Sequence, residues 1–277
     1  MMRPFIIPVV LLMLSPYRTI AALPSSPLEP VYHALFTQRN DLAWQHLIGS
    51  WSKLNSLALH TAWRQALDAV ISGQCGNDLP ITSPAWVDHP SLEIIQRDIP
   101  LNRIYRVQLS GNSPRRNLQF SLSMPNGKVI LEGTEADYDA SGQFRLASQD
   151  QERALPAGSY VLTIRSGGDL WQQALALQGW GNLDWIQRKG DKVYIQPPVI
   201  PSACPNAWLE QALLSRNKNY EQIAWLKSTI LQPQPWSDHG GTVDLWGRIS
   251  VIRIEARGGL TLRLEHRLAG PLLTLQK

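Results

Sequence analysis

The chain has 277 residues, of which 44% are hydrophobic and eleven are tryptophans, with 26 lysines and arginines against 22 acidic residues. This length and composition suffice to bury one large hydrophobic core or two smaller ones. The basic residues are scattered among Gln, Ser and Glu instead of forming a stripe, so we do not expect nucleic acid as a partner.

The first 21 residues have the pattern of a secretory signal peptide. Arg3 supplies the positive charge, residues 5–14 are apolar, and Thr19 and Ala21 place small side chains before the predicted cut. The apolar stretch is about half the ~20 residues that a membrane-spanning helix needs, so we expect cleavage and no stable membrane insertion. The mature chain carries 24 basic and 22 acidic residues, a net charge of +2, and we place it in the periplasm or among secreted proteins.

The mature chain retains both of the cysteines, Cys75 and Cys204. In an oxidising compartment an even number of cysteines most simply forms a disulfide, and two buried free thiols are the alternative. Two cysteines without a nearby pair of histidines cannot supply the four ligands of an ordinary zinc site. We therefore predict a bond between them.

Residues 22–78 are predicted to form an N-terminal helical segment. Helix-capping residues at Ser26, Asn40 and Ser56 each precede apolar residues at helical spacing. After Cys75 the apolar period falls to 2, and turn signals recur between short runs. This pattern predicts an antiparallel β-sandwich of the jelly-roll or immunoglobulin-like type over residues 91–196, within an α+β fold.

Residues 203–232 are predicted to return to helix, as a hairpin that packs with the N-terminal helices. Trp208, Ala212 and Leu213 share one face at helical spacing. The predicted bond would then join two helical segments, with the sandwich inserted between them.

Residues 241–277 are predicted to form C-terminal β-strands that join the sandwich or make a separate small sheet. The turn Arg257-Gly-Gly259 indicates a hairpin. In its second strand, leucines alternate strictly with Arg263, Glu265 and Arg267, so we expect one buried and one wet face.

The segment that begins at Asp137 resembles the start of a calcium-binding loop. Asp137, Asp139 and Ser141 supply alternate oxygens and Gly142 follows. The loop fails at its far end, where Ser148 stands in place of a bidentate Glu. A hairpin turn closed by Asx hydrogen bonds is the alternative, and the incomplete ligand set favours it.

Trp180 and Trp185 are candidate binding residues. Trp180 lies between two glycines, beyond a predicted strand, where an indole ring could be displayed. Exposed rings stack on sugars and on partner surfaces. Indoles buried at the end of the sandwich are the alternative.

Several short segments together resemble an uncharacterised family of exported Gram-negative bacterial proteins, catalogued as a domain of unknown function. They are Leu42-Ala-Trp-Gln45, Cys75-Gly-Asn77, Pro156-Ala-Gly-Ser-Tyr160 and Cys204-Pro-Asn-Ala-Trp208, followed by an Arg-rich β tail. The resemblance covers nearly the whole chain and implies no catalytic residues.

No catalytic motif stands out, and the six histidines are dispersed. We expect a non-catalytic binding or accessory module at the cell envelope, with an envelope protein or a glycan as partner and no required cofactor. A carbohydrate-active protein is the first alternative. A hydrolase with a scattered site, for instance around His239, is the second, because catalytic triads assemble from distant residues.

N-terminal sequencing of the exported protein should give a chain that begins at Ala22, or at Leu23 if the cut follows Ala22. Recovery of Met1 from the periplasmic fraction would contradict the signal peptide.

Overall fold

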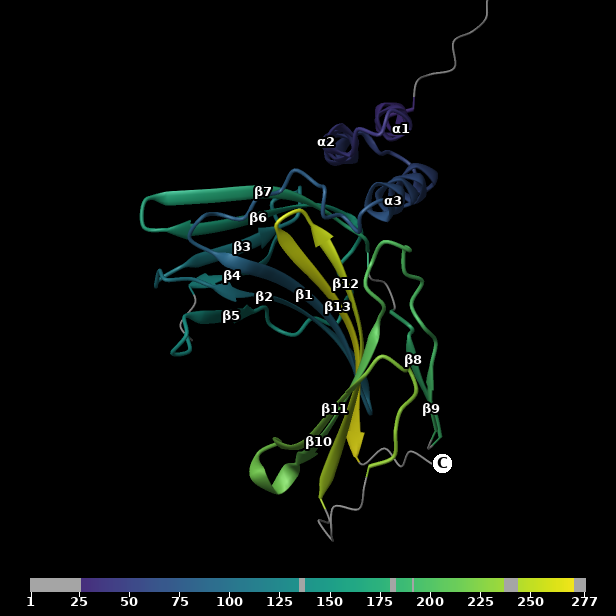
Figure 1. Cartoon of the computed structure of the whole chain (residues 1–277), viewed down its shortest axis with the longest axis vertical. Coiled ribbons are helices and arrows are strands. Elements are labelled where there is room, and N and C mark those ends of the chain that lie inside the picture. Colours follow the sequence, from purple (N-terminus) through teal and green to yellow (C-terminus); the bar gives the residue numbers. More distant parts are fainter. Residues whose placement is uncertain (1–25, 135–137, 180–182, 191, 237–243, 272–277) are drawn as a thin grey trace, which may run out of the picture.

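A computed structural model of the chain describes residues 26–134, 138–179, 183–190, 192–236 and 244–271 (Figure 1). The signal peptide predicted for residues 1–21 lies outside this part. Three helices come first: α1 (Glu29–Phe36), α2 (Asn40–Ser50) and α3 (Leu57–Ser72), with a 3-10 turn, η1 (Trp51–Lys53), after α2. No helix among the described residues is long and apolar enough to cross a membrane.

The rest of the described chain is mostly β and forms three sheets. The largest has seven strands in the order β11-β10-β12-β13-β1-β2-β5: β1 (Asp88–Ile99), β2 (Asn102–Asn112), β5 (Gln143–Ala147), β10 (Trp208–Ser215), β11 (Glu221–Ser228), β12 (Leu245–Arg257) and β13 (Leu260–Pro271). A four-stranded sheet has the order β4-β3-β6-β7: β3 (Gln119–Ser123), β4 (Val129–Thr134), β6 (Gly158–Ser166) and β7 (Asp169–Leu177). A hairpin of β8 (Ile186–Lys189) and β9 (Lys192–Ile195) forms the third, and a 3-10 turn, η2 (Arg216–Lys218), precedes β11.

The seven-stranded sheet is mixed, which corrects the expectation of purely antiparallel strands. β13 pairs with β1 in parallel, with Glu93 beside Arg263 and Arg97 beside Arg267. Its other neighbour is β12, with which it pairs antiparallel across the turn at Gly258. The C-terminal strands therefore lie in the middle of the largest sheet.

One face of the seven-stranded sheet is covered along its length. At one end, buried side chains of β1 and β13, such as Leu92 and Leu262, share a core with Leu162 of β6 and Trp63 of α3. At the other end, Ile186 of the β8–β9 hairpin joins side chains of β10, β12 and β13 in a second core. Figure 1 shows the helices beside β6 and β7 and the small hairpin beside the lower strands. The opposite face is left to carry the polar side chains.

The helical hairpin predicted for residues 203–232 is wrong, because this segment forms β10 and β11. β10 pairs with both β11 and β12, so it is an inner strand of the sheet. Both faces of β10 carry buried apolar residues. Leu209 and Leu213 point to one face, and Ala212 lies on the other. Trp208, Leu209, Ala212 and Leu213 imitate a helical stripe, because apolar residues stand at both alternate sets of positions and leave no period-2 signal.

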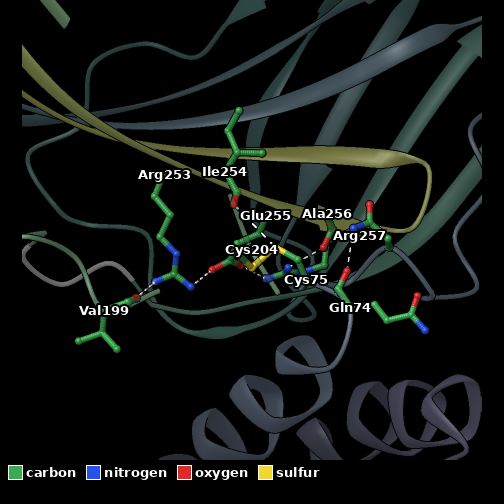
Figure 2. The surroundings of a disulfide bond; sticks show 10 residues. Gln74, Cys75, Val199, Cys204, Arg253, Ile254, Glu255, Ala256 and Arg257 are labelled. Carbon is green, nitrogen blue, oxygen red and sulfur yellow. Dashed lines mark hydrogen bonds and ion pairs between the residues drawn. A yellow bond between two sulfur atoms is a disulfide. The ribbon is translucent and has the colours of Figure 1, made fainter. Parts of the chain in front are cut away.

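The predicted disulfide is confirmed. Cys75 and Cys204 are bonded, with their Cα atoms 4.8 Å apart (Figure 2). Cys75 follows α3 as expected, but Cys204 precedes a strand, so the bond ties the helices to the seven-stranded sheet. The strands between the two cysteines are not an independent insertion, since β1 pairs with β13.

A buried ion cluster lies beside the disulfide on β12 (Figure 2). Arg257 is fully buried, and its guanidinium is 3.0 Å from the carboxylate of Glu255, which also pairs with Arg253. Arg253 donates to the carbonyl oxygen of Val199 at 2.8 Å, and the amide of Ala256 donates to the carbonyl oxygen of Cys75 at 2.9 Å. The segments that carry the two cysteines are thus both fastened to one strand.

Replacing both cysteines by serine should lower the free energy of unfolding by about 2–5 kcal/mol, because the bond closes a loop that restricts the unfolded chain. The separation of 129 residues places the chain-entropy value near the top of that range. Urea unfolding of the oxidised protein and the variant measures the difference. Reductant should lower the stability of the unsubstituted protein alone, and equal stability of all samples would contradict a stabilising bond.

Candidate functional site: a charged cleft

The open face of the seven-stranded sheet holds a cleft of about 390 Å³. Strands β1, β2, β5, β12 and β13, together with Asp150 beyond β5, supply its walls. Its charged lining consists of six arginines and three carboxylates: Arg97, Arg106, Arg145, Arg248, Arg263, Arg267, Glu93, Asp150 and Glu265. The alternation of each strand directs these side chains to this face and sends their neighbours into the cores. The ionised cleft has a surplus of three positive charges.

Two carboxylates organise four of the arginines. Asp150 is 3.0 Å from Arg97 and 2.7 Å from Arg106. Glu265 is 3.3 Å from Arg263 and 2.8 Å from Arg267. Charge-assisted contacts of this kind fix the direction in which a guanidinium presents its remaining N–H groups. The donors are therefore held in place before any ligand arrives.

The other two arginines have no carboxylate within 4 Å among the described residues. Arg145 nevertheless opposes the rise that burial causes in the pKa of Glu93, and Glu265 and Glu210 oppose the lowering that burial causes in the pKa of Arg248. Arg248 donates to the side-chain oxygen of Gln222 at 3.1 Å, and Arg145 is exposed. Two buried nitrogens of the cleft, Nε of Arg97 and Nε of Arg263, also find no hydrogen-bond acceptor in the described chain, although Nε of Arg263 lies 3.9 Å from the carboxylate of Glu93. Two further nitrogens without an acceptor belong to Arg253 and Arg257, in the ion cluster on β12. Such N–H groups are costly to leave unsatisfied and suit an added acceptor.

The pKa values of two arginines in the cleft are lowered mainly by burial and further by neighbouring cations. Burial lowers the pKa of Arg248, and the neighbouring Arg267 lowers it further. Burial also lowers the pKa of Arg97, to which Arg106 and Arg267 add, while Asp150 opposes the shift. An anion between these groups would relieve the repulsion.

The two glutamates of the cleft differ in acidity. Burial raises the pKa of Glu93, although Arg263 opposes the shift. The pKa of Glu265, which is 2% exposed, lies below its usual value. Burial alone would raise it, but Arg267 and Arg263 outweigh the effect of burial. Glu265 therefore stays ionised to a lower pH than an ordinary glutamate, and Glu93 takes up a proton at a higher pH than an ordinary glutamate.

Of the two tryptophans expected to bind a ligand, Trp185 does not line this cleft. Trp185 is partly buried and packs against both cores. This position resembles the alternative, a buried structural indole, more than a displayed ring. Trp180 lies outside the described residues, so a binding role for either side chain stays a prediction.

In the candidate calcium loop, Asp139 is engaged by its own turn. Its Oδ1 accepts hydrogen bonds from the Ser141 hydroxyl at 2.6 Å, the Ser141 amide at 2.8 Å and the Gln143 amide at 2.9 Å. The hydrogen bond from the Ser141 hydroxyl, with those from the backbone amides, lowers the pKa of Asp139. Asp137 lies outside the described residues. In the described chain, no three His, Cys, Asp or Glu residues gather as metal ligands would.

A buried histidine next to an aspartate forms a second polar cluster, on the covered face. Nε2 of His266 is 3.2 Å from Asp98, and Nδ1 accepts the amide proton of Ile186 at 3.0 Å. Both ring nitrogens are thus occupied, so His266 has no nitrogen left to activate a nucleophile. Burial raises the pKa of Asp98, but hydrogen bonds from His266 and Arg103 outweigh it and bring that pKa down to about 2. We assign this cluster a structural role. His239, the other histidine considered for catalysis, lies outside the described residues.

A family model described as "Protein of unknown function (DUF2861)" matches residues 24–235 of the chain. The chain belongs to this family. A comparison with curated proteins gives no match. Among solved structures, the chain is similar to one titled "Biofilm associated protein - BSP domain", with a TM-score of 0.25 and 8% identity, over 66% of this chain and 29% of that one. The chain thus spans less than a third of that structure, and a TM-score this low carries no argument. The region matched by the DUF2861 model ends before β12, so Arg248, Arg263 and Arg267 lie outside it.

Replacing Asp98 by Asn should destabilise the protein by about 2 kcal/mol near neutral pH, because a carboxyl whose pKa falls from 3.8 to about 2 on folding stabilises the ionised folded state. This contribution is present above the unfolded-state pKa and is lost as the pH falls toward 2, so the two unfolding curves should converge in acid. The control is Asp184→Asn, because Asp184 pairs with the same Arg103 but is half exposed and should cost under about 1 kcal/mol. Equal losses in both variants would contradict the special role of Asp98.

Proposed function

We propose that the chain is an exported, non-catalytic binding module of the cell envelope that holds an anionic ligand in the charged cleft. The surplus of arginines over carboxylates is the observation that carries this proposal. Arg97 and Arg263 each keep a buried N–H group without a hydrogen-bond acceptor, and Arg145 and Arg248 have no described carboxylate within 4 Å. Guanidinium groups held in fixed directions suit carboxylate, sulfate or phosphate groups.

The signal-peptide pattern and the disulfide are consistent with a periplasmic or secreted location. The partner would be an envelope protein or a glycan that carries acidic groups. We also propose that β13, β1, β2 and β5 form a β-sandwich of jelly-roll or immunoglobulin-like type with the four-stranded sheet. The single core shared by buried residues of the two sheets supports this class.

A carbohydrate-active enzyme is a second candidate function. The specific observation in its favour is that one cleft contains Glu93, with a raised pKa, and Glu265, with a lowered one. General acid–base catalysis needs carboxyl groups in these two states. Release of new chain ends from a polysaccharide, abolished by Glu93→Gln, would assign the cleft to this class.

Replacing both Arg145 and Arg248 by Gln should lower the affinity for citrate, a small multivalent anion, at least about tenfold, since hydrogen bonds to charged groups contribute roughly 1.5–3 kcal/mol each. Neither arginine is within 4 Å of a carboxylate in the described chain, so the melting temperature without ligand should change little. Titration calorimetry at low salt measures the affinity.

The matched control is the double variant Lys53→Gln and Arg64→Gln. It removes the same charge from η1 and α3, away from the cleft, where both side chains are exposed. This control should bind citrate as the unsubstituted protein does. Absence of citrate binding, or equal losses in the two double variants, would contradict a specific anion site.

A further inference from the structure

An exposed tryptophan lies on the same face of the sheet as the cleft. Trp225 of β11 is 51% exposed and pairs with Ala212 of β10, which in turn pairs with Arg248 of β12. Residues directly opposite each other on neighbouring strands share a face. Trp225 and Arg248 therefore flank a small buried alanine on the open face, about 10 Å apart at their Cα atoms.

The next rows of the sheet continue this surface into the cleft. Lys227 of β11 is beside Glu210 of β10, which is beside Ser250 of β12, and Ser250 is beside Arg267 of β13. One row further, the indole N–H of Trp208 donates to Glu210 at 2.9 Å. An indole, carboxylates and cations thus alternate across the face.

The Trp208 ring is itself covered by cations. The ammonium of Lys227 lies 4.3 Å from its centre and the guanidinium of Arg263 lies 5.8 Å away. These cation–π contacts hold the Trp208 ring in place on the sheet. Trp225, in contrast, presents its ring to solvent and is the aromatic residue available for stacking.

We infer that the ligand is an acidic oligosaccharide or polysaccharide segment, which rests on the proposed function of the cleft. Trp225 stacks on the apolar face of one sugar ring, and Arg248 binds the acidic group of a neighbouring sugar. Aromatic rings supply apolar contact to sugars, and a guanidinium supplies paired donors to a carboxylate. The oligosaccharide then continues along the cleft toward Arg267 and Arg97.

The mixture of charges distinguishes this ligand class from a polyphosphate. Glu210, Glu93 and Asp150 lie in or beside the same cleft, and a phosphate backbone would be repelled by each of them. Sugar hydroxyl groups instead donate hydrogen bonds to carboxylates. An acidic glycan has partners for both signs of charge, whereas nucleic acid requires a basic surface.

Titration calorimetry of the mature protein with oligogalacturonate, with its neutral carboxyl-reduced form and with citrate tests the inference. The acidic oligosaccharide should bind more tightly than both other probes. Trp225→Ala should lower its affinity about tenfold and leave citrate binding unchanged, whereas Arg248→Gln should weaken both. The control is Tyr194→Ala, which removes a half-exposed ring from β9, on the covered side of the sheet, and should change neither affinity.

The outcomes separate the inference from the proposed function. Citrate binding without tighter binding of oligogalacturonate, or an unchanged affinity in Trp225→Ala, overturns the glycan and leaves the anion cleft standing. Equal binding of the acidic and neutral oligosaccharides overturns the role of the acid group. Failure of all three probes to bind overturns both proposals together.

Discussion

β1 and β13 lie side by side over eight registered pairs, from Ser91 beside Thr261 to Asp98 beside Leu268, and the rest of the fold depends on this parallel contact. Parallel neighbours cannot be joined by a tight turn, so the chain must leave the sheet and return. The residues between them form β2, β5, the four-stranded sheet, the β8–β9 hairpin and strands β10 to β12. The same pairing places Glu93 beside Arg263, and a slip of one residue would turn the arginines into the core.

This arrangement explains how one face can carry so many charges. The opposite face holds two hydrophobic cores and the disulfide, which supply the stability that a charged, half-buried surface does not. Glu265 is nearly inaccessible, yet two arginines on its own strand keep it ionised. The cleft is thereby organised before binding, and preorganised donors avoid part of the entropy that a flexible site would lose.

The sequence predicted those features that depend on local patterns. The N-terminal helices, the bond between Cys75 and Cys204 and the alternation of the last strand could all be found in this way. Residues 203–232 misled the prediction because the apolar residues of β10 stand at helical spacing and at both alternate sets of positions, so only tertiary pairing distinguishes this strand from a helix. The cleft was not predicted because its arginines come from five strands that the parallel contact brings together. The one local signal was that every second residue of β13 from Thr261 to Arg267 is polar, including Arg263 and Glu265. This pattern indicated a solvent-exposed face but no binding site.

An anion bound on the open face would change the NMR signals of the arginine Nε–H groups around it. Addition of oligogalacturonate should shift the Nε–H signals of Arg97 and Arg263, whose nitrogens have no hydrogen-bond acceptor in the described chain. The signal of Arg64, on α3, should stay in place. Unchanged signals at Arg97 and Arg263, equal shifts at all three arginines, or a shift at Arg64 alone would contradict an anion site on this face.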